Sequence, residues 1–363
     1  MRSEFVGRWL LTDEGAVEGF LRLENDEVAE IGLGFAPADS VRALVLPAFV
    51  NAHTHIGDSL AYPAPKGSLE ETVAPPSGYK HRILRSASRA AKIDAMRESL
   101  VLMSHTGTSA FIDFREEGLE GVRALSEASV PESPRPVVLG RPASPDTTAD
   151  EIGVLLDECD GIAMSSIRDW SFAFLSELSR RAKSAGKAFS VHVSEAVHED
   201  FDRVLDLKPD FVVHMNQAAD DDLKACADAG IPVVVCPRSN EFFGIEQDIP
   251  RLLRAGLAVA LGTDNGMIAR PDMFEEIKAA FRSAKSKGSI SALEAVSLAT
   301  FGGRKVLNAA AKITQEIGAK SDFVAVRVGG DDPLMEMVTK ASSRDIVAVI
   351  RGGKVRRSGD WTT

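Results

Sequence analysis

The sequence predicts a closed (β/α)8 barrel, and two observations indicate it. Eight short apolar runs, rich in β-branched residues, recur between residues 45 and 262, and a helical pattern follows most of them. Glycines stand where the C-caps of these helices would fall, at Gly186, Gly230 and Gly256. Alternating strands and helices are typical of a parallel sheet covered by helices, and eight strands close such a sheet into a barrel.

The expected strands come in a regular order along the chain. They are residues 45–51, 108–114, 136–140, 161–165, 188–193, 211–215, 232–236 and 257–262. Helical patterns follow at residues 94–104, 119–129, 169–185, 220–229 and 273–284. A doubly wound open sheet is the alternative, but the Gly-rich phosphate loop expected after its first strand is missing.

Both ends of the chain differ from this body. Residues 1–46 read as short strands with glycine turns, and residues 319–363 show two strands and a Gly352-Gly353 turn. Because domain termini usually lie close together, we expect these two segments to pair with each other. The barrel itself would span residues 47–318, which suits the roughly 250 residues or more of such a fold.

The longest break in the pattern is the segment of residues 57–82, which is rich in proline and glycine. Loops of this length inside a compact domain are commonly lids or binding loops. We therefore expect this segment to cover a site.

Composition excludes several classes of protein. The chain carries 42 Lys and Arg against 53 Asp and Glu, a net charge of −11, and its basic residues are scattered. That pattern argues against nucleic-acid binding. No run of about 18 apolar residues indicates a membrane span. The three cysteines are widely spaced and form no C-x-x-C pair, which is typical of free thiols in a reducing compartment. We expect a cytoplasmic protein that acts on a small molecule.

The clearest chemical signal is an apolar strand that ends in His53-Thr54-His55. Side chains two apart on a strand point the same way, so both imidazoles can bind one ion. Taken alone, the pattern fits two solvated surface histidines equally well.

Three further strands also end in groups that bind metals or transfer protons. His192 ends the fifth strand with Glu195 just beyond it, His214 ends the sixth, and Asp264 follows the eighth. Barrel enzymes of this type place their active sites at the carboxyl ends of the strands. Three neutral imidazoles and one carboxylate would hold one divalent ion and leave a position for water, as a catalytic site needs.

These residues resemble the amidohydrolase superfamily, in particular the deaminase and chlorohydrolase branch that includes cytosine deaminase and methylthioadenosine/S-adenosylhomocysteine deaminase. The matching pieces are residues 47–55, 192–195, His214, 236–240 and 261–264, and the resemblance covers nearly the whole chain. It implies a TIM barrel with a small β-sandwich domain assembled from both termini. It also implies a homodimer or larger homo-oligomer.

The resemblance assigns a role to each site residue. His53, His55, His192 and Asp264 would bind one ion, with Zn2+ preferred and Fe2+ the alternative, because no lysine ends the fourth strand to hold a second ion. His214 and Asp264 would take a proton from a water activated by the ion. Glu195 would pass a proton to the substrate, so that an amino-substituted nitrogen heterocycle loses ammonia.

Other activities remain open. The same residues suit hydrolysis of a cyclic or linear C–N amide or amidine bond, or dehalogenation of a ring, whereas a non-catalytic scaffold would be expected to lose ligands. The substrate histidine of adenosine-type relatives is absent from residues 165–170. Arg238, Asn240 and His81 are the candidate substrate-binding residues, Arg238 because a guanidinium offers a planar fork of donors.

Overall fold

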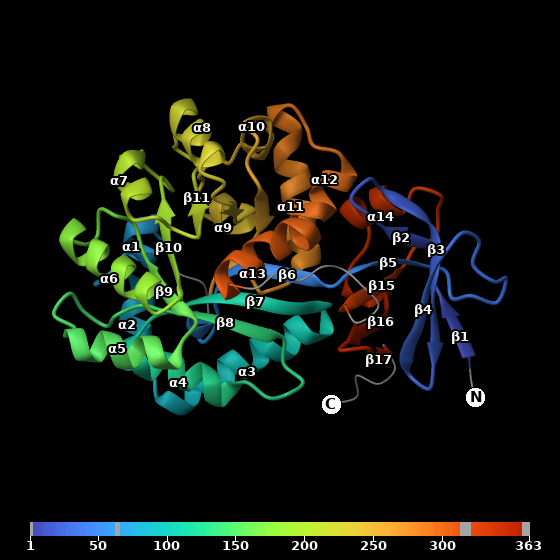
Figure 1. Ribbon diagram of the computed structural model, residues 1–363, viewed down its shortest axis with the longest axis horizontal. Coiled ribbons are helices and arrows are strands. Elements are labelled where there is room, and N and C mark those ends of the chain that lie inside the picture. The colour runs from blue at the N-terminus through green and yellow to red at the C-terminus, as the bar shows by residue number, and fades with distance from the viewer. Residues whose placement is uncertain (1–2, 62–65, 313–320, 358–363) are drawn as a thin grey trace.

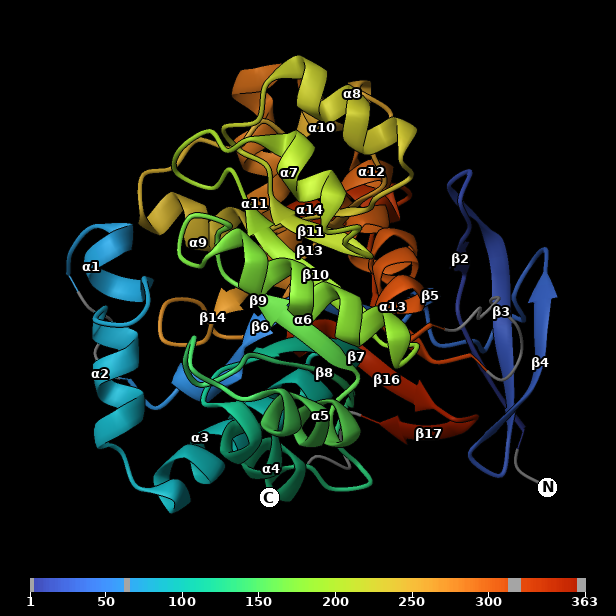
Figure 2. The same cartoon turned by 60° about the vertical axis from the view of Figure 1, so that its left-hand side comes forward.

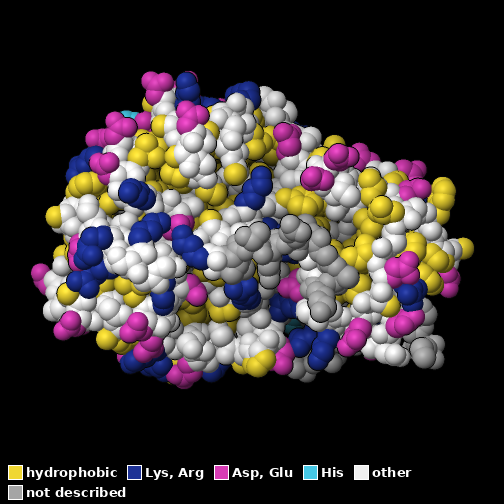
Figure 3. Space-filling model, viewed as in Figure 1, with side chains coloured by type: hydrophobic (Ala, Val, Ile, Leu, Met, Phe, Trp, Pro, Cys, Tyr) yellow, Lys and Arg dark blue, Asp and Glu magenta, His cyan; other side chains and the backbone are white. Residues whose placement is uncertain are grey.

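The computed structural model describes residues 3–61, 66–312 and 321–357. It has two parts, a large α/β body and a smaller β domain beside it (Figure 1). Acidic and basic side chains are interspersed over the face shown in Figure 3. In the described ranges, no helix combines the length and the apolar character that crossing a bilayer requires.

The α/β body is built on a parallel sheet with the order β13-β12-β11-β10-β9-β8-β7-β6-β14. Its last strand, β14, begins three residues after the end of β13 and pairs with β6, aligning Asp264 with Thr54 and Asn265 with His55. The two edges of the sheet thereby meet, and the body is a TIM-barrel-like domain. The strands are β6 (Phe49–His55), β7 (Thr108–Arg115), β8 (Arg135–Gly140), β9 (Gly161–Met164), β10 (Ala188–Val193), β11 (Phe211–His214), β12 (Val233–Val235), β13 (Val259–Leu261) and β14 (Asp264–Asn265).

Helices cover the outside of this sheet, as the two views show (Figures 1 and 2). They are α3 (Arg89–His105), α4 (Gly118–Ala128), α5 (Ala149–Glu158), α6 (Phe172–Ser184), α7 (Phe201–Asp206), α8 (Asp220–Asp228), α9 (Pro237–Phe242), α10 (Ile249–Arg254), α11 (Met273–Ala284), α12 (Ala292–Ser297) and α13 (Gly303–Ala311). Helix α13 is the exception: it contacts strands all round the barrel, from β6 to β13. It contributes Val306, Leu307 and Ala310 to the apolar cluster inside the barrel, which also holds Ala110 and Ala188 from the strands.

The β domain takes strands from both ends of the chain, as the sequence predicts. Its sheet has the order β1-β3-β2-β5-β15-β16-β17-β4, and β3 also pairs with β4, so the sheet closes on itself. The expected sandwich of two stacked sheets is therefore wrong in this detail. The strands are β1 (Ser3–Val6), β2 (Trp9–Leu11), β3 (Ala16–Glu24), β4 (Glu27–Leu33), β5 (Ala43–Pro47), β15 (Phe323–Arg327), β16 (Ile346–Arg351) and β17 (Lys354–Arg357), with α14 (Pro333–Thr339) between β15 and β16.

The first expected strand needs a correction, because residues 45–51 belong to two sheets. Strand β5 pairs with β15, aligning Leu46 with Val324, whereas β6 begins two residues after β5 and joins the barrel. The division predicted at residue 46 stays a prediction. The boundary predicted at residue 318 lies outside the described residues.

The segment of residues 57–82 is not the extended loop that its prolines and glycines suggest. It contains α1 (Leu69–Val73) and the start of α2 (Tyr79–Ser86). Helix α1 begins with a capping box in which the Ser68 hydroxyl accepts from the Glu71 N–H and the Glu71 carboxylate accepts from the Ser68 N–H. Pro63 and Pro65 lie outside the described residues. In Figure 2 both helices lie at the side of the barrel, near β14.

Candidate metal centre and active site

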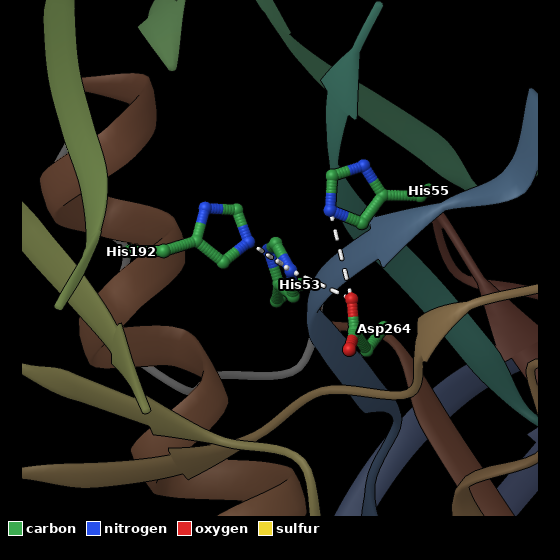
Figure 4. Close-up of side chains that lie close together, drawn as sticks. All are labelled: His53, His55, His192 and Asp264. Atoms are coloured by element: carbon green, nitrogen blue, oxygen red, sulfur yellow. Dashed lines mark hydrogen bonds and ion pairs between the residues drawn. The ribbon is translucent and has the colours of Figure 1, made fainter. Parts of the chain in front are cut away.

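Four side chains converge at the carboxyl ends of the barrel strands (Figure 4). His53 and His55 come from β6, His192 from β10 and Asp264 from β14, and all four are largely or fully buried. One ligand atom from each lies within 4.8 Å of the others. The Nε2 atoms of His53 and His192 are 3.2 Å apart, and Asp264 Oδ1 lies 3.3 Å from His53 Nε2 and 3.6 Å from His55 Nε2.

The hydrogen bonds on the far sides of two rings explain how they are oriented. His55 Nδ1 lies 3.0 Å from the Phe114 carbonyl, and His192 Nδ1 lies 3.0 Å from the Met164 carbonyl. A carbonyl only accepts, so each Nδ1 must carry the hydrogen and each Nε2 keeps its lone pair. Lone pairs and a carboxylate aimed at one buried point repel each other unless a cation lies between them. The four residues therefore fit a metal ion, and they form a metal-binding group.

Burial keeps His55 and His192 in the neutral form that binds metals. It lowers the pKa of His55 to about 3, with Lys80 as the next cause. Burial followed by the neighbouring imidazoles also lowers the pKa of His192 well below its usual value. Burial acts to raise the pKa of Asp264, but His53, His55 and His214 outweigh it and hold that pKa well below the usual range. At neutral pH, His55 and His192 are therefore neutral and Asp264 is charged.

The backbone is shaped to bring these strand ends together. Asp264 and His214 have φ values of 60° and 81°, a region that non-glycine residues rarely adopt. A Cβ atom on Gly262 would lie 2.7 Å from the Cβ of His53 and 2.8 Å from its backbone nitrogen, so only glycine fits beside the ligand strand.

A second group shares Asp264 with the first. Glu195, His214 and Asp264 also offer ligand atoms within 4.8 Å of one another, and His214 Nε2 lies 3.5 Å from Glu195 Oε1. Burial, then the charge of Asp264, raises the pKa of Glu195 well above its usual value. Burial lowers the pKa of His214 to about 4. Near neutral pH, Glu195 therefore carries a proton that it can donate, and His214 can accept one.

The three predicted substrate-binding residues lie outside both groups. Arg238 begins α9 with its Nε 2.5 Å from Glu276 Oε2 and one terminal nitrogen 2.7 Å from the Arg270 carbonyl. His81 Nε2 lies 3.2 Å from the Val73 carbonyl. Asn240 is buried and donates to Asn216 at 3.4 Å. Arg238 and His81 thus have partners within the chain, and the substrate role of all three stays a prediction. Arg238 lines a cavity of about 590 Å³ that none of the four ligand residues reaches.

Sequence reasoning missed Arg141, which directly follows β8 and is only 6% exposed. Val137 and Leu139, four and two positions earlier, belong to the apolar cluster inside the barrel, so alternation turns Arg141 to the same side at the strand end. Its Nε has no hydrogen-bond partner among the described residues. Burial lowers the pKa of this guanidinium, although Glu116 and Asp169 oppose the shift.

Sequence reasoning also missed an ionic cluster beside His55. Lys80, from α2, is 2% exposed and lies 2.5 Å from Glu116 Oε1, while Arg115 lies 2.6 Å from Glu116 Oε2. The pair Arg115-Glu116 was a visible signal, because two charged residues stand together at the end of an apolar barrel strand. Nothing in the local sequence marks Lys80.

Comparison with known proteins places this site in a family. The model of the amidohydrolase family matches residues 44–356, which is most of the chain. The chain belongs to the amidohydrolase family. The family predicted from the motifs at the strand ends is thereby confirmed, and this amidohydrolase is a hydrolase that acts on carbon–nitrogen bonds.

The relatives extend over almost the whole length of the amidohydrolase. A putative aminohydrolase of Methanothermobacter thermautotrophicus is 31% identical over 93% of this chain and 92% of its own. A 5-methylthioadenosine/S-adenosylhomocysteine deaminase of Halobacterium salinarum is 27% identical over 96% of this chain and 90% of its own. The crystal structure of an adenosine deaminase from Xanthomonas campestris with bound zinc matches with a TM-score of 0.78 and 20% identity, covering 99% of this chain and 94% of that one. At that identity, the structural match supports the fold.

Proposed function

We propose that this amidohydrolase is a zinc-dependent deaminase that releases ammonia from an amino-substituted nitrogen heterocycle. The observation that carries the proposal is the pairing of two groups around Asp264. One group can hold a divalent ion, and the other places a protonated Glu195 beside a neutral His214. Deamination by water requires both a proton acceptor and a proton donor next to the reacting carbon.

When bound, a divalent ion would act as a Lewis acid and lower the pKa of a coordinated water towards neutrality. His214 and Asp264 would accept the proton that this water gives up as its oxygen adds to the amino-bearing carbon. Glu195 would donate its proton to a ring nitrogen. The proton taken from water would then pass to the amino group, the proton left on the added oxygen would return to Glu195, and the carbon–nitrogen bond would break to release ammonia.

Zinc is proposed over iron because the donor set of three imidazoles and one carboxylate, with no thiolate, suits a catalytic zinc site. A single ion is proposed because the residue after β9 is Ser165 rather than a lysine that could bridge two ions. The cytoplasmic location and the homo-oligomeric assembly expected from the sequence stay predictions.

A panel of aminopyrimidines, aminopurines, pterins and aminotriazines would test the activity. The zinc-loaded protein should release ammonia from at least one class, and the chelator-treated protein should not. Mass spectrometry of the product distinguishes the alternatives, because ring opening retains the nitrogen in the product and dehalogenation releases halide. Failure to release ammonia across the whole panel, together with turnover of a cyclic amide or a chlorinated ring, would replace the deaminase proposal.

A further inference from the structure

Glu116 lies behind His55, on the side of the ring that faces away from Asp264. The distance from His55 Nδ1 to Glu116 Oε1 is 2.7 Å, shorter than the 3.0 Å to the Phe114 carbonyl. His192 Nδ1 meets a backbone carbonyl instead, and His53 Nδ1 has no hydrogen-bond partner within the described part of the chain. Among these three ligands, His55 is therefore the one whose Nδ1 atom lies next to a carboxylate.

A carboxylate buried this deeply needs compensating charge. Glu116 is 2% exposed, and each of its oxygens meets a cation, Lys80 Nζ at 2.5 Å and Arg115 at 2.6 Å. Removing water from an ion is unfavourable unless opposite charges replace the lost hydration. The two cations allow Glu116 to stay charged next to the metal-binding group.

Lys80 also connects the elements that carry two of the ligands. Its Nζ lies 3.0 Å from Asn265 Oδ1, and Asn265 directly follows Asp264 in β14. The same atom lies 3.7 Å from Asp58 Oδ2. The ammonium group thus donates a hydrogen bond to Asn265 and forms ion pairs with Glu116 and Asp58. Lys80 is therefore placed to hold these three elements together.

We propose that Glu116 and Lys80 are positioning residues of the metal centre: Glu116 holds His55 with Nε2 towards the ion, and Lys80 fixes both Glu116 and helix α2. The inference rests on the proposed metal-dependent function. A carboxylate partner fixes the orientation of a histidine ligand and increases its donor strength. Because Lys80 belongs to α2, binding of the ion and docking of α2 against the barrel should strengthen each other reciprocally.

Zinc affinity measured on the full-length protein tests the proposal without reference to turnover. The stripped protein would be titrated with Zn2+ in competition with a chromophoric chelator. Glu116→Gln keeps the size of the side chain but removes its charge, and it should raise the Kd for zinc by about 10–100-fold. Lys80→Met should raise the Kd in the same direction. The matched controls are Glu117→Gln and Lys92→Met. Glu117 follows Glu116 in the sequence and forms an ion pair with Lys92, but neither residue touches a metal ligand.

Two further readouts separate positioning from general loss of structure. The visible spectrum of the Co2+-loaded protein should change in Glu116→Gln, because the spectrum reports ligand geometry. Hydrogen exchange in residues 79–86 should slow when zinc binds the wild-type protein, and this protection should shrink in Lys80→Met. Should Glu116→Gln fail to fold, Glu116→Asp keeps the charge but withdraws it from His55, and it should also weaken zinc binding.

The outcomes distinguish this inference from the proposed function. Zinc affinity and a Co2+ spectrum equal to wild type in Glu116→Gln, or in Glu116→Asp if that variant is used, would overturn the positioning role whatever the substrate is. Zinc binding by Lys80→Met as tight as that by Lys92→Met would overturn it as well. Weakened zinc binding in a protein that releases no ammonia would support the positioning role and reject the deaminase. A wild-type protein that binds no zinc would reject both.

Discussion

Asp264 and Glu195 offer carboxylate oxygens within 4.8 Å of each other and have opposite protonation states near neutral pH. Asp264 is surrounded by imidazoles and accepts from the Ser239 hydroxyl at 2.6 Å, so its charge is stabilised. Glu195 is largely removed from water and faces the charge of Asp264, so its proton is retained. Environments that push two pKa values apart assign the base and the acid of a site.

Glu195→Gln tests the acid role at the scale of one residue. The amide keeps the shape but cannot donate a proton as an acid does, and kcat should fall by about 10²–10⁴-fold. Zinc content measured by elemental analysis should stay at the wild-type level, because Glu195 is absent from the group of four ligands. A variant that retains wild-type turnover would assign the acid role to another residue.

The pH dependence of kcat/KM should show two limbs. Burial lowers the pKa of His214 to about 4, so His214 is neutral above that pH and activity should fall only as the pH drops through about 4. Burial raises the pKa of Glu195, so Glu195 loses its proton, and activity falls, on the alkaline side well above its usual range. A profile recorded with zinc in excess checks both limbs. An acid limb near the ordinary histidine pKa would contradict the burial of His214.

Arg141→Met should weaken substrate binding rather than slow the chemistry. The guanidinium of Arg141 is buried at the carboxyl end of β8 with an unpaired Nε, so it suits a carbonyl or anionic group on the substrate. Losing a charged hydrogen bond of this kind should raise KM by about 10–100-fold with little change in kcat. Steady-state kinetics measures the split, and thermal unfolding provides the control. An unchanged KM would place Arg141 outside the substrate site.

At the scale of elements, the contact between β13 and β6 controls the ligand geometry. Gly262 follows β13, and any Cβ there would overlap the backbone of His53. The closing pair of β14 and β6 lies immediately beyond this contact. Close packing between β13 and β6 therefore determines the position of Asp264 relative to the histidine ligands.

Gly262→Ala should lower the free energy of unfolding by about 1–3 kcal/mol through overpacking and should also weaken zinc binding. Gly153→Ala in α5 is the matched control, because a Cβ there has no heavy atom within 4 Å. That change should stabilise the protein by about 0.5–1 kcal/mol, since alanine favours helix. Denaturant unfolding and zinc titration check both variants. Equal zinc affinity in Gly262→Ala and wild type would show that β6 tolerates the displacement.

At the scale of the whole molecule, the ligands come from β6, β10 and β14, so a bound ion links distant parts of the chain. Zinc at about 100 times its Kd should stabilise the fold by about 2.7 kcal/mol. Chelation should therefore lower Tm, and added Zn2+ should restore it. In His192→Ala the chelator should have little effect, and a full chelator-dependent shift in that variant would place the ion elsewhere.

Much of the architecture was predictable because its signals are local. The alternation of β-branched runs and helical patterns indicated the barrel, and His or Asp at several strand ends indicated the ligand group. The run of residues 45–51 misled because hydrophobicity does not reveal where a chain leaves one sheet for another. Arg238 and Arg141 both follow a strand, but Arg238 begins a helix and turns to Glu276, whereas Arg141 keeps the inward alternation. The role of Lys80 could not be predicted, because its partners Glu116 and Asn265 are distant in sequence.

The position of Asp264 on the strand that completes the ring has a consequence for synthesis. A ribosome delivers the chain from its amino end, so the three histidines emerge well before the carboxylate. A nascent chain that ends before β14 offers imidazoles without their anionic partner and without the pairing between β14 and β6. Stable capture of the ion must therefore wait until the barrel is nearly complete, and truncated translation products should be unable to sequester zinc in this way.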